Sequence, residues 1–274
     1  MQAANKIGIF DSGLGGLTVF KKLKKRFPKQ SFIYLGDLAY LPYGSKSDQA
    51  IIDRSKKITD FFIKNNVQTI IVACNSASSV ALDTLKSLYN IPIIGVIKPS
   101  ITLAAKTTKT KTIGVIGTQK TISSRAYNQS AIACLGEASV HYKLISIACP
   151  LFVPLVEEGW ENTDITYDIA YKYCKHFQPY HDLDTLILGC THYPILSQTL
   201  QNVFNDYGHQ NLSFIECGDA IVDKIKNWIS SNQITEKLTD QEDLFFITDT
   251  SHKFEELANK FLGYKISNIN VISL

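Results

Sequence analysis

The sequence contains no C-x-x-C pair, although six of its 274 residues are cysteines. The cysteines are widely separated, which is not the spacing of a disulfide-stapled scaffold. A chain that keeps its cysteines as free thiols is expected in a reducing compartment. We therefore predict a cytoplasmic protein whose free thiols are Cys74, Cys134, Cys149, Cys174, Cys190 and Cys217.

Long apolar runs are also missing. The longest weakly polar run, Ile145–Val156, is interrupted by Pro150 and Pro154. It falls short of the roughly 20 residues that cross a bilayer. Near the start of the chain, the apolar run Ile7–Phe10 is too short for the core of a secretory signal. We expect no membrane partner.

Neither sign of charge is in large excess, because 28 Lys and Arg oppose 25 Asp and Glu and leave a net charge of +3. The densest basic cluster, at 21–26, alternates with Leu23 and Phe27 at helical spacing. This pattern is typical of the solvent-facing side of an amphipathic helix. We therefore expect no nucleic-acid partner.

Short apolar runs alternate with helical patterns along the whole chain, which predicts parallel α/β sheets. The expected strands are Ile7–Phe10, Phe32–Leu35, Thr69–Ala73, Ile93–Val96, Thr112–Ile116, Tyr142–Ile147, Thr185–Leu188, Ser213–Glu216, Leu244–Thr248 and Asn270–Leu274. The expected helices are Leu17–Phe27, Asp48–Lys64, Ser76–Leu88, Ser123–Leu135, Ile165–Phe177, Ile195–Phe204, Ala220–Ile229 and His252–Phe261.

Two stretches of the chain are nearly alike. The segment 69–76 (TIIVACNS) is echoed by 185–192 (TLILGCTH), each an apolar run followed by a small residue, a cysteine and two polar residues. The run reads as a buried parallel strand, and ligands of α/β sheets bind at the carboxyl ends of strands. Cys74 and Cys190 are therefore expected at such ends, one in each half. Two matched thiols suit a reaction that removes a proton from one face of a substrate and returns it to the other.

A second echo supports an internal duplication. The segment 7–12 (IGIFDS) resembles 113–118 (IGVIGT), in the same order and at a similar offset. The alternative is chance similarity between buried strands. Duplication predicts two similar lobes, each a mainly parallel sheet flanked by helices, related by a pseudo-twofold axis with the active site between them. We assign 1–98 plus 212–274 to lobe one and 99–211 to lobe two, with the Lys106–Thr112 run as a crossing.

Both thiols are expected at the N-terminus of a helix, where exposed amides favour a thiolate by roughly 0.3–1 kcal/mol. Each thiol also needs a neighbour that accepts or supplies a proton. Asp11, at the end of the first strand, and His192, two residues past Cys190, are the candidates. The alternatives are a capping carboxylate and a packing histidine. We interpret Cys134, Cys149 and Cys174 as inert.

The glycines of 13–16 (GLGG) follow a strand but lack the third glycine of a dinucleotide-binding loop, where Thr18 stands. They are better suited to let the backbone approach a small anion at a helix N-terminus. The turn Leu41–Gly44 follows the second strand at the same sheet edge, so Tyr43 either lines the pocket or belongs to a plain surface turn.

These motifs together resemble glutamate racemase, a family of the aspartate/glutamate racemases. The resemblance rests on 8–19 (GIFDSGLGGLTV), 41–44 (LPYG), 73–76 (ACNS), 150–157 (PLFVPLVE) and 188–194 (LGCTHYP), in the family's order and spacing. One departure is Ser76, where the family more usually has threonine.

The resemblance implies a cofactor-free isomerase that interconverts L- and D-glutamate, supplies D-glutamate for peptidoglycan and forms a homodimer. It implies that Cys74 deprotonates D-glutamate with help from Asp11, and that Cys190 deprotonates L-glutamate with help from His192. Glu157 matches an acidic position linked to that histidine. The implied substrate contacts are Asp11, Ser12, Pro42, Tyr43, Gly44, Cys74, Asn75, Ser76, Thr118, Thr121, Cys190, Thr191 and His192.

Three rival functions stay open at this point. Aspartate racemase shares the two-cysteine logic. A metal hydrolase could ligate zinc through Cys190, His192, Cys74 and Asp11, although we expect no metal. A non-catalytic module would bind an amino acid without exchanging its α-proton.

Overall fold

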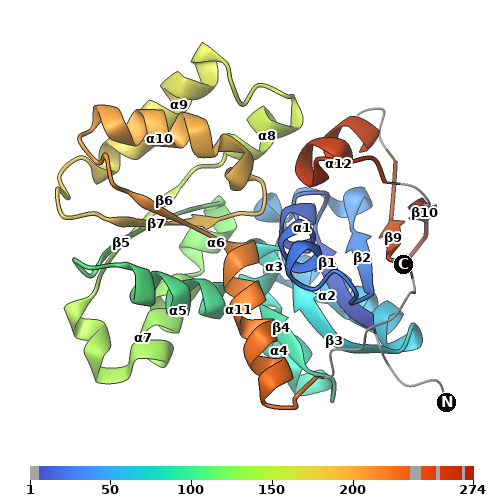
Figure 1. Ribbon diagram of the computed structural model, residues 1–274. Coiled ribbons are helices and arrows are strands. Elements are labelled where there is room, and N and C mark those ends of the chain that lie inside the picture. Colours follow the sequence, from blue (N-terminus) through green and yellow to red (C-terminus); the bar gives the residue numbers. More distant parts are fainter. Residues whose placement is uncertain (1–5, 235–241, 251–253, 267–268) are drawn as a thin grey trace.

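The computed structural model describes residues 6–234, 242–250, 254–266 and 269–274, which form two parallel sheets flanked by helices (Figure 1). The larger sheet has six strands in the order β10-β9-β2-β1-β3-β4. The smaller has four strands in the order β6-β5-β7-β8. The strands of the larger sheet are β1 (Lys6–Asp11), β2 (Phe32–Gly36), β3 (Val67–Val72), β4 (Ile93–Gly95), β9 (Leu244–Ile247) and β10 (Ile269–Val271). Those of the smaller sheet are β5 (Thr112–Gly117), β6 (Lys143–Ala148), β7 (Thr185–Gly189) and β8 (Ser213–Glu216).

Helices cover both faces of each sheet, and α11 packs against α1 and α5 between the two sheets (Figure 1). The helices are α1 (Leu17–Arg26), α2 (Asp48–Lys64), α3 (Asn75–Val80), α4 (Leu82–Leu88), α5 (Ile97–Thr107), α6 (Gln119–Ser123), α7 (Ala126–Leu135), α8 (Phe152–Glu157), α9 (Asp164–Cys174), α10 (Ser197–Asp206), α11 (Cys217–Ser230) and α12 (Phe254–Leu262). Short 3-10 turns are η1 (Leu38–Tyr40), η2 (Tyr43–Ser45), η3 (Gly136–His141), η4 (Lys175–Phe177) and η5 (Tyr193–Leu196).

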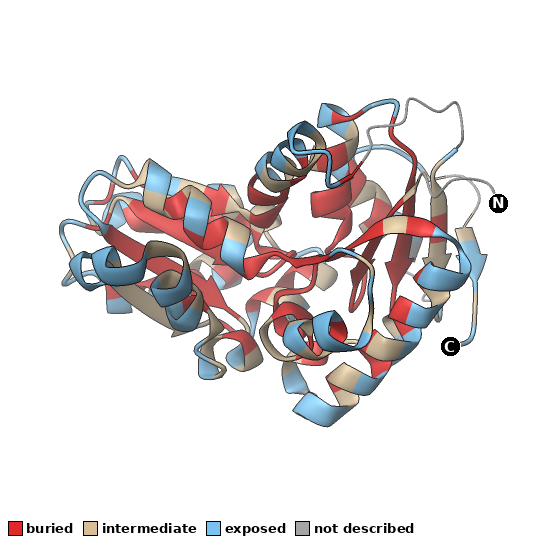
Figure 2. Cartoon of the chain, turned by 90° about the horizontal axis from the view of Figure 1, so that it is seen from below, coloured by how far each residue is buried: buried red, intermediate tan, exposed pale blue. Residues whose placement is uncertain are grey.

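The central strands are buried on both faces, as Figure 2 shows in red. Every residue of β5 and β7 is buried, and so are five of the six residues of β1. Because both faces are covered by helices, such strands must be apolar throughout rather than alternating. The predicted fold class, α/β with two parallel sheets flanked by helices, is confirmed.

The strand order agrees with an internal duplication. Strands β1 to β4 are arranged 2-1-3-4, and strands β5 to β8 are arranged 6-5-7-8, which is the same order. The echoed segments therefore occupy equivalent places, with β1 matching β5 and β3 matching β7. Cys74 comes shortly after β3, which pairs with β1, and Cys190 comes directly after β7, which pairs with β5.

Several predicted boundaries differ from the structure. The expected helix 76–88 is two helices that meet at Ala81, and the expected helix 123–135 is broken at Arg125, whose φ is 55°. The sequence pattern predicts no helix over α5, which the structure shows at Ile97–Thr107. Its Pro99 is compatible with a helix because it lies in the first turn, where no backbone hydrogen bond is lost. The expected crossing at 106–112 is the link between α5, which ends at Thr107, and β5, which begins at Thr112. Residues 252–253 of the last predicted helix lie outside the described residues.

One strand contradicts the predicted lobe boundary at 212. Strand β8 pairs with β7 in the smaller sheet, with Leu186 opposite Phe214. The segment after 212 has no internal echo, so its first strand could not be placed by repetition. The second crossing between the sheets therefore comes after Glu216, and the rest of the lobe division stays a prediction.

Candidate active site

Polar side chains at the ends of β1, β3, β5 and β7 meet across the two sheets. The hydroxyls of Ser76 and Thr118 lie 3.0 Å apart, and those of Thr118 and Thr121 also lie 3.0 Å apart. The Thr191 hydroxyl donates to Asp11 Oδ2 at 3.3 Å, and the Thr18 hydroxyl donates to the Thr191 carbonyl at 3.1 Å. The carboxyl ends of the four echoed strands therefore face one another.

The two matched thiols lie at this junction. Cys74 is the N-cap residue of α3, and its thiol donates to the Ser12 hydroxyl at 3.6 Å. Cys190 directly follows β7, three residues before the 3-10 turn η5, so its predicted place at the N-terminus of a helix is wrong. Cys74 and Cys190 keep 6% and 7% exposure, whereas Cys149 and Cys174 have none. The last two are buried thiols of the core, in agreement with their inert interpretation.

The expected effect of the helix N-terminus on these thiols is outweighed by burial. Burial raises the pKa of Cys74 to about 12, and the negative charge of Asp11 acts in the same direction, although the Ala77 amide and Ser12 oppose it. Burial also raises the pKa of Cys190 well above its ordinary value, and Asp11 and Cys74 add to the shift. Asp11 is thus close enough to affect both sulfurs. Each thiolate would be a strong base that forms only with help from a neighbour.

This pKa shift predicts a loss of stability at alkaline pH. The pKa of the Cys74 thiol is about 12 in the folded protein, whereas its ordinary value is 9.0. The contribution of this thiol to the free energy of unfolding is therefore fully present below pH 9 and is lost as the pH rises toward 12. We expect this thiol to contribute a slope of about 1.4 kcal/mol per pH unit. Urea unfolding between pH 9 and 10.5 should show a shallower dependence in Cys74→Ser than in the wild type. Equal slopes would contradict the shift.

Asp11 is fully buried beside the second lobe. Its Oδ1 accepts from the Gly13 amide at 3.1 Å. Burial raises its pKa, while the charge of His192 lowers it. The carboxylate therefore holds the glycine loop and also lies within electrostatic reach of His192, so both interpretations of Asp11 have structural support.

His192 is held by an acidic partner, at 3% exposure. Its Nε2 lies 3.0 Å from Glu157 Oε1, and the Phe261 ring of α12 packs edge-to-face on the imidazole at 5.2 Å between centroids. The sequence-based pairing of Glu157 with this histidine is thus present in the structure. A ring fixed through Nε2 leaves Nδ1 facing the glycine loop.

The glycine loop makes a close contact with the second lobe. A Cβ on Gly15 would lie 2.4 Å from Thr191 Oγ1 and 2.5 Å from His192 Nδ1. Only glycine permits this approach. The loop therefore serves first to bring the two strand ends together, and its predicted role in binding an anion stays a prediction.

Tyr43 turns its side chain into lobe one. Its hydroxyl donates to Asp37 Oδ2 at 2.6 Å, and Asp37 also accepts two hydrogen bonds from the buried Arg54. Gly44, next in the chain, lies against Thr118, because a Cβ there would come 3.2 Å from the Thr118 Cβ. Tyr43 is 1% exposed, so it does not belong to a plain surface turn, and its place in the substrate pocket stays a prediction. Pro42 is the residue before η2.

Two buried groups were not predicted from the sequence. The first is the pair Asp37 and Arg54, and the second is Tyr127 with Cys217, which both contact Asn75. The only signal for the first pair was the position of Asp37 after a strand. Tyr127 and Cys217 carried no motif, because both reach Asn75 from helices that start far away in the chain.

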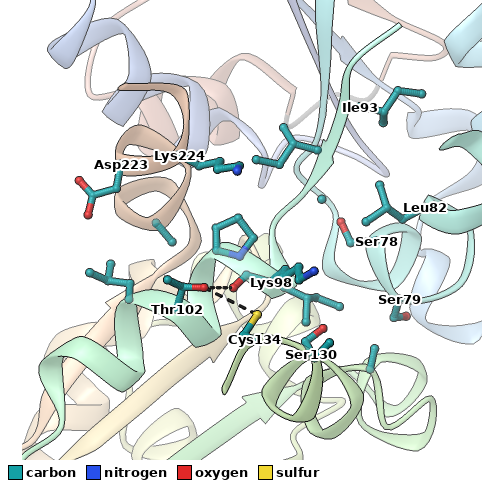
Figure 3. A pocket seen from close by; sticks show the side chains of 18 of the residues that line it. Ser78, Ser79, Leu82, Ile93, Lys98, Thr102, Ser130, Cys134, Asp223 and Lys224 are labelled. Carbon is teal, nitrogen blue, oxygen red and sulfur yellow. Dashed lines mark hydrogen bonds between the residues drawn. The ribbon is translucent and has the colours of Figure 1, made fainter. Parts of the chain in front are cut away.

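A cavity of about 590 Å³ opens elsewhere on the protein, lined by other side chains (Figure 3). Side chains from α4, β4, α5, α7 and α11 line it, among them Leu82, Ile93, Lys98, Cys134 and Lys224. None of the predicted site residues borders it. Within the described ranges, no three His, Cys, Asp or Glu side chains are grouped to hold a metal ion, so the zinc alternative finds no ligand set there.

The two parallel sheets of like strand order, with one thiol at each matched strand end, define a two-lobed α/β protein with a candidate active site where the strand ends meet. The model of the family Asp/Glu/Hydantoin racemase matches residues 7–225. A glutamate racemase from Hydrogenobaculum sp. is 40% identical over 273 residues, with 98% of each chain covered. Crystal structures of similar fold are a glutamate racemase isoform from Bacillus anthracis (TM-score 0.87, 32% identity, 100% of this chain and 98% of that one) and glutamate racemase from Francisella tularensis in complex with D-glutamate (TM-score 0.86, 32% identity, 98% of each).

The chain therefore belongs to the Asp/Glu/hydantoin racemase family. It is an amino-acid racemase, which is an isomerase, and the resemblance predicted from its motifs is confirmed. No helix among the described residues is long and apolar enough to span a membrane.

Proposed function

We propose that this protein interconverts L- and D-glutamate without a cofactor, by proton transfer between the α-carbon and two cysteine thiols. The observation that carries the proposal is the position of Cys74 and Cys190 at matched strand ends, both slightly exposed and both influenced by Asp11. The relatives and neighbours at 32–40% identity are glutamate racemases, which supports glutamate as the substrate.

In the proposed reaction, the Cys74 thiolate removes the α-proton of D-glutamate, and the Cys190 thiol donates its proton to the opposite face of the resulting carbanion. The reverse direction exchanges the two roles. Asp11 accepts the proton that frees the Cys74 thiolate, and His192, held by Glu157, does the same for Cys190. A thiolate of raised pKa suits the task, because the α-hydrogen of an amino acid is a weak acid.

Donors from both lobes would hold the substrate in place. The hydroxyls of Ser76, Thr118 and Thr121 form one cluster that could bind a carboxylate. A carbanion without a cofactor depends on such donors and on excluded water. The proposed contacts are Asp11, Ser12, Pro42, Tyr43, Gly44, Cys74, Asn75, Ser76, Thr118, Thr121, Cys190, Thr191 and His192.

We also propose a cellular role and an oligomeric state for this enzyme. D-Glutamate from this enzyme would enter peptidoglycan, and the enzyme would act in the cytoplasm as a homodimer. These statements follow from the resemblance to glutamate racemases. Aspartate racemase is the second candidate, and side-by-side assays on both amino acids distinguish the two.

Proton exchange in deuterated water tests the reaction directly. We expect each glutamate enantiomer to acquire deuterium at its α-carbon in the presence of the protein, as followed by NMR or mass spectrometry, with its mirror image appearing in parallel. Aspartate serves as the control substrate and should exchange far more slowly. Binding of glutamate without deuterium uptake would instead identify a non-catalytic binding module.

A further inference from the structure

Tyr127 contacts the chain beside both thiols. Its hydroxyl donates a hydrogen bond of 2.8 Å to Asn75 Oδ1, and Asn75 directly follows Cys74. Its ring lies against Gly189, which directly precedes Cys190, because a Cβ on Gly189 would come 3.3 Å from a ring carbon and from the hydroxyl oxygen. The side chain is 2% exposed. One rigid aromatic group therefore spans the two strand ends that carry the sulfurs.

The Asn75 amide is held at both of its ends. Tyr127 donates to the amide oxygen, and the amide nitrogen donates to Cys217 Sγ at 3.3 Å. The Cys217 thiol in turn donates to the Leu188 carbonyl at 3.4 Å, in the strand that leads to Cys190. These partners fix which way the amide faces, so its second N–H has a defined direction.

We propose that Tyr127 is a positioning residue of the racemase reaction. It orients the Asn75 amide and sets the separation of the strand ends of Cys74 and Cys190. The proposal rests on the proposed function, in which Asn75 contacts the substrate and the thiols act from opposite sides. Without the hydroxyl, the buried amide oxygen loses its 2.8 Å donor and keeps only the longer contact with the Cys217 thiol at 3.8 Å, so the amide is held less firmly. A small misplacement of a group that holds the substrate is costly, because the reaction requires closely aligned atoms.

Tyr127→Phe removes the hydroxyl and keeps the ring against Gly189. We expect kcat/KM for both glutamate enantiomers to fall about tenfold, mainly through a higher KM, because one hydrogen bond to a substrate-holding group is lost. The matched control is Tyr89→Phe, which removes a hydroxyl that donates to Asp60 at 2.8 Å on lobe one. The control should keep wild-type kcat and KM. An unchanged KM in Tyr127→Phe would overturn the proposal.

A double-mutant cycle separates positioning from general stability. If Tyr127 acts through Asn75, then Tyr127→Phe should change kcat/KM by less than about twofold when Asn75→Ala is already present. An equal loss in both backgrounds would overturn the proposal. Should Asn75→Ala unfold the protein, Asn75→Ser, which also removes the amide oxygen that Tyr127 holds, takes its place in the cycle. Calorimetric titration of glutamate reports the same coupling as a ratio of Kd values, so it still tests Tyr127 if the wild type binds glutamate but fails to exchange its α-proton.

Discussion

Replacing Cys74 by serine is expected to lower kcat by about 10²- to 10⁴-fold in both directions, and Cys190→Ser by a similar factor. In the proposed reaction each thiol is the base in one direction and the acid in the other, so neither direction should survive the loss of one sulfur. Serine keeps the size of the side chain, but its hydroxyl is a far weaker acid and cannot supply the thiolate. Polarimetry that starts from each pure enantiomer measures both directions.

Cys134→Ser is the matched control for these variants. Cys134 is half-buried in α7 and borders the cavity of Figure 3, which none of the predicted site residues lines. We expect this variant to turn over glutamate at the wild-type rate. Near-wild-type turnover from either Cys74→Ser or Cys190→Ser would eliminate the two-thiol mechanism.

Gly15→Ala should reduce kcat/KM by about a hundredfold. The new methyl group would need the space now taken by Thr191 Oγ1, 2.4 Å away, and by His192 Nδ1, 2.5 Å away. Either the imidazole or the Thr191 hydroxyl must move, and the latter also gives up its hydrogen bond to Asp11. The substitution adds a single carbon and no charge, so the loss would report geometry alone.

Gly218→Ala controls for the general effect of adding a methyl group. A Cβ on Gly218 would lie 2.8 Å from Lys22 Cγ and 3.4 Å from the Thr18 carbonyl oxygen, so it crowds the contact between α1 and α11 and not His192. We expect wild-type kinetics from this variant. Full activity in Gly15→Ala would show that the loop does not set the position of His192.

The strands, and the position of Cys74 and Cys190 just after two of them, could be predicted from the sequence because both depend on local pattern. Buried parallel strands are continuous apolar runs, and the strand Phe32–Leu35 and the helix Asp48–Lys64 agree with the structure to within one residue. The matched segments around Cys74 and Cys190 indicated equivalent strand ends, and the common strand order agrees. The contact between Glu157 and His192 could be predicted only from the resemblance to glutamate racemase, because 35 positions separate the two residues and no local pattern links them.

What could not be predicted depends on contacts between distant segments. The Tyr43 side chain is directed inward by Asp37 and Arg54, and its own turn gives no sign of that network. Strand β8 joins the smaller sheet because β7 offers it an edge, which no feature of residues 213–216 reveals. The net pKa of the thiols reflects burial by the whole fold, whereas the sequence indicated only the local helix terminus.

The buried apolar cluster that contains Phe20 and Phe245 of the six-stranded half continues without a break into Phe177 and Phe204 of the four-stranded half. The two halves repeat each other in strand order, but they share one hydrophobic core and so do not fold independently. Neither half excised alone would retain a closed interior, and the entire protein should melt as one cooperative body. Whatever freedom the halves have to open around a substrate must therefore come from small rotations about a shared interior.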